Sequence, residues 1–137
     1  MTAYIASVIL NGMEAAALRG TPRLLIVEDD VMIRRSLARC LHGRYDTRSV
    51  GCANDALTLL RRERFDLVLC DVHMPETSGK ELFGMVESEM PEQASRFVFL
   101  SGVVDHWDRE EPFLSKPVSK QELESTLEGV LAKHALP

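Results

Sequence analysis

Three uninterrupted apolar runs constrain the fold of this chain more than any other feature of its sequence. They are Leu24–Val27, Leu67–Cys70 and Phe97–Leu100, and each stops at an acidic or hydroxyl residue. A strand-length run that is apolar at every position has both faces buried, which is typical of parallel sheets in α/β proteins. The runs therefore predict a parallel sheet that is covered by helices on both sides.

Helical patterns alternate with these strands. The expected helices are Val31–His42, Asn54–Arg62, Gly79–Met90 and Ser119–Lys133, and two weaker strands are expected at Tyr45–Val50 and Phe113–Ser115. We expect the partly polar strand Tyr45–Val50 at an edge of the sheet. Strands that alternate with helices form βαβ units with right-handed crossovers. The predicted fold is of the α/β class, a doubly wound, five-stranded parallel sheet.

Local signals predict where several of these helices begin and end. Gly43 is expected just after the end of the first helix, where a left-handed backbone is favoured. Asn54 is interpreted as the N-cap of the second helix. Ser119 and Glu122 have the spacing of a capping box at the start of the last helix.

Composition narrows the class of protein. The 137 residues carry a net charge of −5 and are 45% hydrophobic, which indicates one folded domain and excludes a mainly disordered chain. The acidic balance argues against direct binding of nucleic acid, and no apolar run is long enough to span a membrane. Cys40, Cys52 and Cys70 lack metal-ligand spacing, and we interpret them as reduced residues of a cytoplasmic protein.

Residues 1–20 form an apolar N-terminal extension that we separate from the domain at 21–137. Apolar residues in the extension recur at helical spacing, at Ile5, Val8, Ile9 and Met13. We favour a helix that packs on its own domain, or a linker remnant, over a helix that forms a homodimer. No basic residue precedes the apolar stretch, so we do not expect a signal peptide.

Polar residues that could carry chemistry follow the ends of the predicted strands, where sites of open α/β sheets lie. They are Glu28, Asp29, Asp30, Asp71, Ser101 and Lys116. Clustered carboxylates repel one another unless a cation joins them, and such oxygen ligands suit Mg²⁺. A carboxylate can also attack phosphorus, and an ammonium and a hydroxyl can stabilise the transferred group. These residue types predict phosphoryl transfer onto Asp71 with Mg²⁺ as the cofactor.

Four segments in order, LLIVEDDVMIRRSL, LVLCDVHMPETSG, FVFLSG and FLSKPV, resemble the CheY-like receiver domain of bacterial two-component response regulators. The resemblance covers residues 23–131 and implies a flavodoxin-like sheet order of 2-1-3-4-5. It also implies a signalling domain, not a classical enzyme, that is phosphorylated by a sensor histidine kinase or a histidine phosphotransfer protein. Because the chain stops at Pro137, we expect one of three roles. The domain signals by contact with an unidentified downstream protein, it is a phosphate relay, or it is a fragment of a hybrid kinase.

The resemblance also implies a role for each residue of the metal site. Asp71 is similar to the phosphoacceptor, Asp29 to the direct Mg²⁺ ligand, and Glu28 to the acid that acts partly through water. The main-chain carbonyl of His73 corresponds to a further ligand. Its side chain is expected near the site entrance, where residues of the family affect the rate of dephosphorylation.

The remaining roles concern the phosphoryl group and the switch. Ser101 corresponds to the hydroxyl residue that turns toward the phosphoryl group, and Lys116 to the lysine that contacts it. Pro117 follows in what is usually a cis peptide. Phe113 matches the aromatic residue that changes rotamer on activation, and Gly79 belongs to the loop after the acceptor.

The connection before the last strand departs from the family pattern. Only ten residues, 102–111, are left for a crossover that normally includes a helix. We therefore expect a shortened or missing fourth helix, which puts the usual output surface in doubt. Trp107 in this segment is interpreted as cover for the core edge in preference to an exposed anchor for a partner.

Two other functions remain as alternatives. The first is a phosphorylation-independent docking module that uses residues 102–111. The second is a haloacid-dehalogenase-type phosphatase, which needs an acid where His73 stands. Arg34, Arg35 and Arg39 on the first helix are interpreted as a solvated face, with contact to an acidic kinase surface as the alternative.

Overall fold

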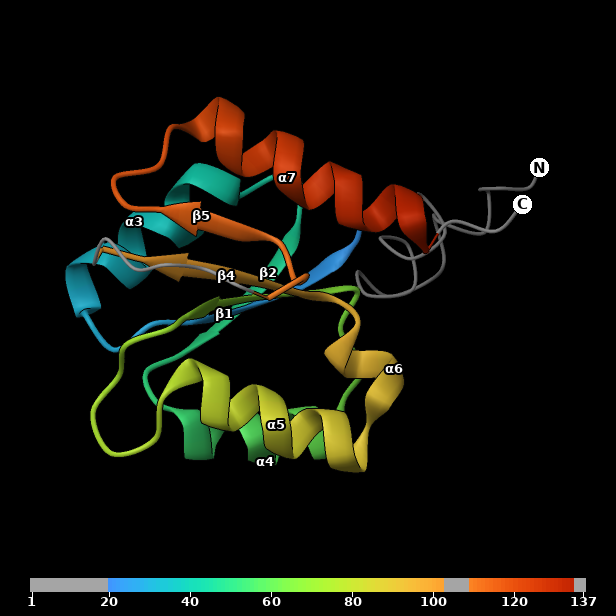
Figure 1. The fold of residues 1–137 in the computed structure, drawn as a ribbon. Helices are drawn as coiled ribbons and strands as arrows, with labels where there is room; N and C mark the ends of the chain where they lie inside the picture. The colour runs from blue at the N-terminus through green and yellow to red at the C-terminus, as the bar shows by residue number, and fades with distance from the viewer. Residues whose placement is uncertain (1–19, 103–108, 135–137) are drawn as a thin grey trace, which may run out of the picture.

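The computed structural model describes residues 20–102 and 109–134, and its centre is a five-stranded sheet (Figure 1). The strands are β1 (Arg23–Val27), β2 (Asp46–Val50), β3 (Leu67–Asp71), β4 (Phe97–Ser101) and β5 (Phe113–Ser115). All neighbouring pairs are parallel, in the order β2-β1-β3-β4-β5. The predicted α/β class and sheet order are confirmed, and β2 lies at an edge as expected.

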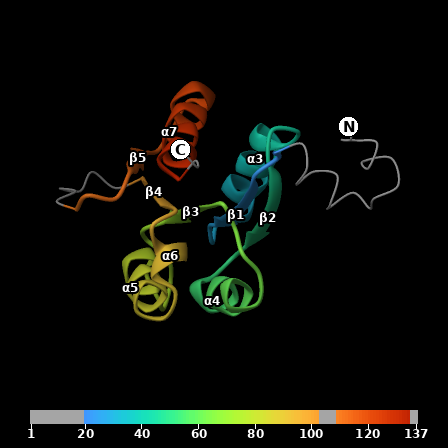
Figure 2. The ribbon, with the colours of Figure 1, turned by 90° about the vertical axis from the view of Figure 1, so that its right-hand side faces the viewer.

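Helices cover both faces of the sheet (Figure 2). On one face lie α3 (Val31–Leu41) and α7 (Lys120–Lys133), and on the other α4 (Ala53–Arg62), α5 (Gly79–Glu89) and the short α6 (Pro91–Ala94). Successive strand residues point to opposite faces, so Leu24 and Ile26 join the core under α3 and α7 while Leu25 and Val27 join the other core. This double burial is the physical reason for the uninterrupted apolar runs.

The helix ends agree with the sequence signals in two cases and differ in one. Gly43 follows α3 with a φ of +91°, and Ser119 and Glu122 form the predicted capping box of α7. The prediction of Asn54 as a cap is wrong, because α4 begins at Ala53 and its N-cap is Cys52, which makes no side-chain cap bond. Ala53 is buried in the same core as Ala56, so the helix extends one residue earlier to bury it.

The short helix α6 was not predicted, because Pro91 resembled the end of the preceding helix. Proline is tolerated in the first turn of a helix, and Pro91 occupies that position. Gln93 of α6 is buried, and its side-chain amide donates to the Phe65 carbonyl at 2.8 Å and accepts from the Phe65 N–H at 3.1 Å. These two bonds satisfy the backbone at the turn before β3.

The crossover between β4 and β5 is short, as predicted. Its described residues, 102 and 109–112, are not helical. Within this stretch the Arg109 guanidinium lies 5.2 Å from the centre of the Phe83 ring, on a side of the core where Phe83 also packs edge-on against Phe97. The prediction for Trp107 lies outside the described residues, and so does that for the helical extension at residues 1–20, except for Gly20.

Two further expectations concern cysteines and membranes. Cys70 is buried, Cys40 and Cys52 are half-buried, and all three are free thiols. Burial raises the pKa of the Cys70 thiol above its usual range, so it stays protonated. Among the described helices, none combines the length and the apolar character that a membrane crossing requires.

Candidate functional site

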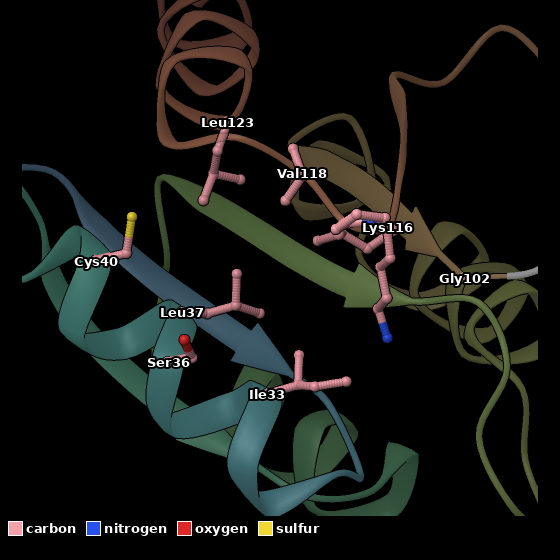
Figure 3. A pocket seen from close by; sticks show the side chains of 10 residues that line it. Ile33, Ser36, Leu37, Cys40, Gly102, Lys116, Val118 and Leu123 are labelled. Atoms are coloured by element: carbon pink, nitrogen blue, oxygen red, sulfur yellow. The ribbon is translucent and has the colours of Figure 1, made fainter.

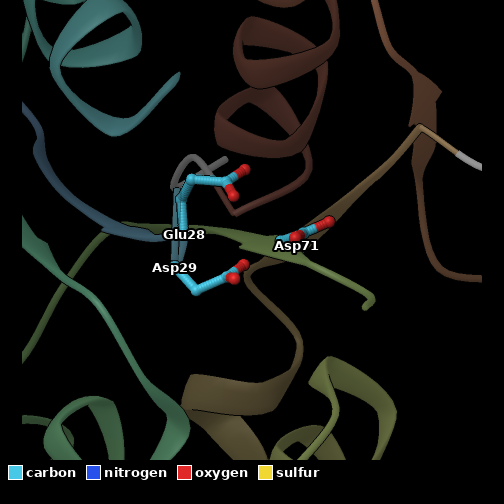
Figure 4. A group of neighbouring side chains, drawn as sticks. All are labelled: Glu28, Asp29 and Asp71. Carbon is cyan, nitrogen blue, oxygen red and sulfur yellow. The ribbon is translucent and has the colours of Figure 1, made fainter. Parts of the chain in front are cut away.

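The parallel pairing of β1 with β3 brings three carboxylates together. Val27 and Cys70 are partners in the sheet, so the next residues, Glu28 and Asp71, lie side by side. Carboxylate oxygens of Glu28, Asp29 and Asp71 all lie within 4.8 Å of one another. Figure 4 shows the Glu28 and Asp29 side chains on opposite sides of β1, both directed toward Asp71. Glu28 and Asp71 are almost fully buried, with 2% and 5% of their surface exposed.

Lys116 brings one positive charge into this acidic cluster. Its Nζ donates to Oε1 of Glu28 at 2.7 Å and lies 3.4 Å from Oδ1 of Asp71. Its backbone N–H donates to the carbonyl of Ser101 at 2.7 Å, which ties it to the end of β4. The peptide bond between Lys116 and Pro117 is cis, as the resemblance implied. The ammonium therefore lies between the two buried carboxylates.

Burial makes the ionised forms of Glu28 and Asp71 unfavourable. Burial raises the pKa of Glu28 and of Asp71 above their usual values, although Lys116 opposes both shifts. Burial alone would lower the pKa of Lys116, but its hydrogen bond to Glu28 and the charge of Asp71 raise it overall. Two of the three carboxylates thus share one ammonium. Hard oxygen ligands of this kind fit Mg²⁺.

The backbone around Asp71 is held by the segment that follows it. The N–H of His73 donates to the Asp71 carboxylate, and the N–H of Gly79 donates to the carbonyl of Val72 at 2.8 Å. Gly79 begins α5 so close to β3 that an added Cβ would collide with the main-chain oxygen of Asp71. This glycine is therefore required by packing against the predicted acceptor.

The other predicted site residues differ in how deeply they are buried. Ser101 is buried at the end of β4, next to the end of β3. The His73 side chain is exposed. Phe113 is half-buried at the start of β5 and packs against the core on the α4 and α5 side.

Asp30 does not belong to the carboxylate cluster, although the sequence placed it beside Glu28 and Asp29. It is the N-cap of α3, and its Oδ1 accepts the N–H of Ile33 at 3.0 Å. Its own N–H donates to Oε2 of Glu28 at 3.2 Å. Asp30 is therefore the last residue of the acidic loop, which consists of residues 28–30, and the N-cap of α3.

Arg34 is a residue whose contact with the site the sequence reasoning missed. It is half-buried, and its Nη1 donates to the main-chain oxygen of Glu28 at 2.8 Å, so the solvated-face interpretation is wrong for this arginine. Arg35 and Arg39 are exposed, as predicted. Spacing gave only a partial signal. Helical side chains tilt toward the helix N-terminus, so Arg34 in the first turn of α3 can reach back to Glu28, but the sequence does not mark a main-chain oxygen as its partner.

An apolar groove of about 450 Å³ lies beside the cluster, between α3 and α7 (Figure 3). Ile33 and Leu37 line it from α3, Leu123 lines it from α7, and Lys116 lies along its wall. Lys116 thus belongs both to the groove and to the contacts of the carboxylate cluster.

Burial of the Asp71 carboxyl predicts the effect of Asp71→Asn on stability without Mg²⁺. Because burial raises the pKa of Asp71, the folded state disfavours its ionised form, and Asn is expected to increase the free energy of unfolding at neutral pH. Wild-type stability should rise toward that of the variant as pH falls through the raised pKa, since the folded carboxyl then binds its proton.

Urea unfolding of both proteins tests this expectation. Saturating Mg²⁺ should reverse the order, because ligand binding stabilises only the protein that keeps the carboxylate. A variant that is less stable than wild type without Mg²⁺ would contradict the argument from burial of the carboxylate.

Comparison with known proteins agrees with this geometry. The family model of the response regulator receiver domain matches residues 24–128. The transcriptional regulatory protein BtsR of Salmonella typhi is 34% identical over 113 residues, which cover 77% of this chain and 46% of BtsR. The two-component response regulator ORR21 of Oryza sativa subsp. japonica is 32% identical over 123 residues, which cover 81% of this chain and 17% of ORR21. The chain thus spans less than half the length of these relatives.

Solved structures give the same result. The signal receiver domain of an HD domain-containing protein from Pseudomonas fluorescens Pf-5 is 28% identical, with a TM-score of 0.74 over 82% of this chain and 96% of that one. Chemotaxis protein CheY4 of Vibrio cholerae is 25% identical, with a TM-score of 0.69 over 81% of this chain and 99% of that one. With the family model matched over most of the chain and the sheet order shared, this chain belongs to the response regulator receiver domain family.

Proposed function

We propose that this chain is a phosphoacceptor signalling domain that takes a phosphoryl group onto Asp71 from a phosphohistidine. The donor is a sensor histidine kinase or a histidine phosphotransfer protein. The observation that carries the proposal is the buried Asp71 carboxylate at the end of β3, with oxygens of Glu28 and Asp29 within 4.8 Å and the Lys116 ammonium at 3.4 Å.

The transfer exchanges one bond to phosphorus for another. A carboxylate oxygen of Asp71 attacks phosphorus, the P–N bond to the donor imidazole breaks, and its electron pair stays on the imidazole nitrogen. In the slow hydrolysis that ends the signal, water attacks phosphorus and the P–O bond to Asp71 breaks. The carboxylate is restored and inorganic phosphate leaves, so no separate substrate is turned over.

Asp29, Asp71 and the main-chain carbonyl of His73 would hold Mg²⁺, with Glu28 acting partly through water. The bound cation supplies positive charge to the oxygens of the transferred group. Three carboxylates with oxygens within 4.8 Å of one another, two of them buried, account for the fit. The His73 N–H bond to the Asp71 carboxylate orients the nucleophile.

Lys116 and Ser101 act on the phosphoryl group itself. The Lys116 ammonium neutralises charge on its oxygens, and the Ser101 hydroxyl donates to them once Asp71 is phosphorylated. Phe113, half-buried three residues before Lys116 in β5, responds by changing its rotamer. The altered surface then signals to a downstream protein by contact.

Intact-mass measurement with a small phosphodonor tests the function. The protein is incubated with Mg²⁺ and either acetyl phosphate or phosphoramidate, which carries the P–N bond of the natural donor. We expect a single phosphoryl adduct that requires Mg²⁺ and is absent in Asp71→Asn. The control Asp46→Asn changes a carboxylate at the start of β2, whereas Asp71 lies at the end of the parallel strand β3, and this variant should keep the adduct.

Two outcomes would contradict the proposal. An adduct that persists in Asp71→Asn, or that forms equally without Mg²⁺, would place the chemistry elsewhere. No adduct from either donor, together with no binding of Mg²⁺, would favour the phosphorylation-independent docking module.

A further inference from the structure

Arg34 holds the main chain of the acidic loop at one atom. Its Nη1 donates to the carbonyl oxygen of Glu28 at 2.8 Å, from the first turns of α3. The guanidinium lies against Gly51, just after β2, where an added Cβ would be only 2.9 Å from Nη1. The missing side chain of Gly51 therefore leaves the room that the guanidinium occupies.

The oxygen that Arg34 binds belongs to the peptide unit that joins Glu28 to Asp29. This unit is planar, so holding its oxygen fixes the direction in which the chain continues to the Asp29 Cα. On the other side, the N–H of Glu28 donates to the carbonyl of Val50 at 3.1 Å. The N–H of Glu28 is thus held by β2, and its carbonyl is held by Arg34 of α3.

The side chains on either side of this peptide unit are the two acids directed at Asp71 (Figure 4). We propose that Arg34, seated in the space left by Gly51, is a positioning residue that sets the Mg²⁺ affinity of the site through the peptide bond between Glu28 and Asp29. The inference rests on the proposed function, because it assigns Asp29 to the metal. Removal of a group that orients a metal ligand without itself binding the metal typically weakens metal affinity by about 10-fold to 100-fold.

Two substitutions change the contact by different routes. Arg34→Gln removes the guanidinium, whereas Gly51→Ala leaves Arg34 and its charge in the protein but adds a Cβ 2.9 Å from Nη1, so the flexible end of Arg34 must shift. Gly51 does not have a left-handed φ, so alanine fits its backbone. Arg35→Gln is the matched control, because Arg35 is the exposed neighbour of Arg34 on the same helix.

The measurement is the Mg²⁺ dissociation constant by titration calorimetry, alongside urea unfolding without Mg²⁺. We expect Arg34→Gln to weaken Mg²⁺ binding by about 10-fold, Gly51→Ala to weaken it less, and Arg35→Gln to bind as wild type does. The double variant should bind Mg²⁺ no more weakly than Arg34→Gln, because both substitutions act on the same contact. At saturating Mg²⁺, phosphorylation by acetyl phosphate should return to the wild-type rate.

The outcomes separate this inference from the function on which it rests. If wild type binds Mg²⁺ and forms the adduct while Arg34→Gln binds Mg²⁺ equally well, the positioning role fails and the proposed function stands. Additive losses in the double variant, or a lower unfolding free energy with unchanged Mg²⁺ affinity, would also overturn the role. If wild type binds no Mg²⁺, both the function and the inference are wrong.

Discussion

Replacement of Gly79 by alanine is expected to destabilise the domain by about 3 kcal/mol, the upper part of the range for overpacking. The added Cβ would collide with the main-chain oxygen of Asp71 and lie 3.0 Å from the Cα of Val72. Both neighbours are backbone atoms, so no side-chain rotation relieves the collision. Either α5 or the end of β3 must move, and movement of β3 displaces Asp71.

Gly84→Ala is the matched control for this prediction. Gly84 lies in the exposed middle of the same helix, and an added Cβ there meets nothing within 4 Å. Alanine should stabilise this position by about 0.5–1 kcal/mol, because it restricts the unfolded chain and favours the helix. Urea unfolding measures both effects, and a Gly79→Ala variant as stable as Gly84→Ala would contradict the packing argument.

Lys116→Met is expected to change two properties of the site in opposite directions. Phosphorylation by acetyl phosphate should be slower by about 100-fold, the usual effect of removing one charged or hydrogen-bonding group that stabilises a transition state. Mg²⁺ should bind more tightly. The ammonium hydrogen-bonds Glu28 at 2.7 Å and lies near Asp71, so it competes with a cation for both carboxylates.

Lys120→Met tests whether these effects are specific. Lys120 is the exposed first residue of α7 and, like Lys116, carries one positive charge. It should leave both the phosphorylation rate and the Mg²⁺ dissociation constant unchanged. Weaker Mg²⁺ binding in Lys116→Met would mean that the lysine organises the carboxylates and does not compete for them.

Much of the site could be predicted because parallel strands end at one edge of the sheet. Glu28 and Asp71 follow two apolar runs, and once these runs are neighbouring strands the carboxylates must lie close together. Lys116 was predictable in the same way from the last strand. Spacing along the chain could not show that the ammonium bonds Glu28 more closely than Asp71.

The failures have a common physical origin in contacts that no local sequence pattern marks. Gln93 carries no local sign that its amide binds the backbone of Phe65, 28 residues earlier. Gly79 carries no local sign that β3 passes against its Cα. Arg34 resembled a solvated arginine because its partner, a main-chain oxygen, has no sequence signature.

The sequence by itself determined the α/β class, the alternation of strands and helices, and the acids, hydroxyl and ammonium at the strand ends. These follow from local rules. A strand that is buried on both faces is apolar at every position, and the residue after it lies where the parallel strands end. Tertiary structure alone decided which carboxylates converge and which cap a helix, and that Arg34 lies against Gly51 and binds the peptide bond between two acids. Such contacts depend on how separate elements pack at distances of 3 Å, and no residue's local pattern encodes its neighbour across the fold.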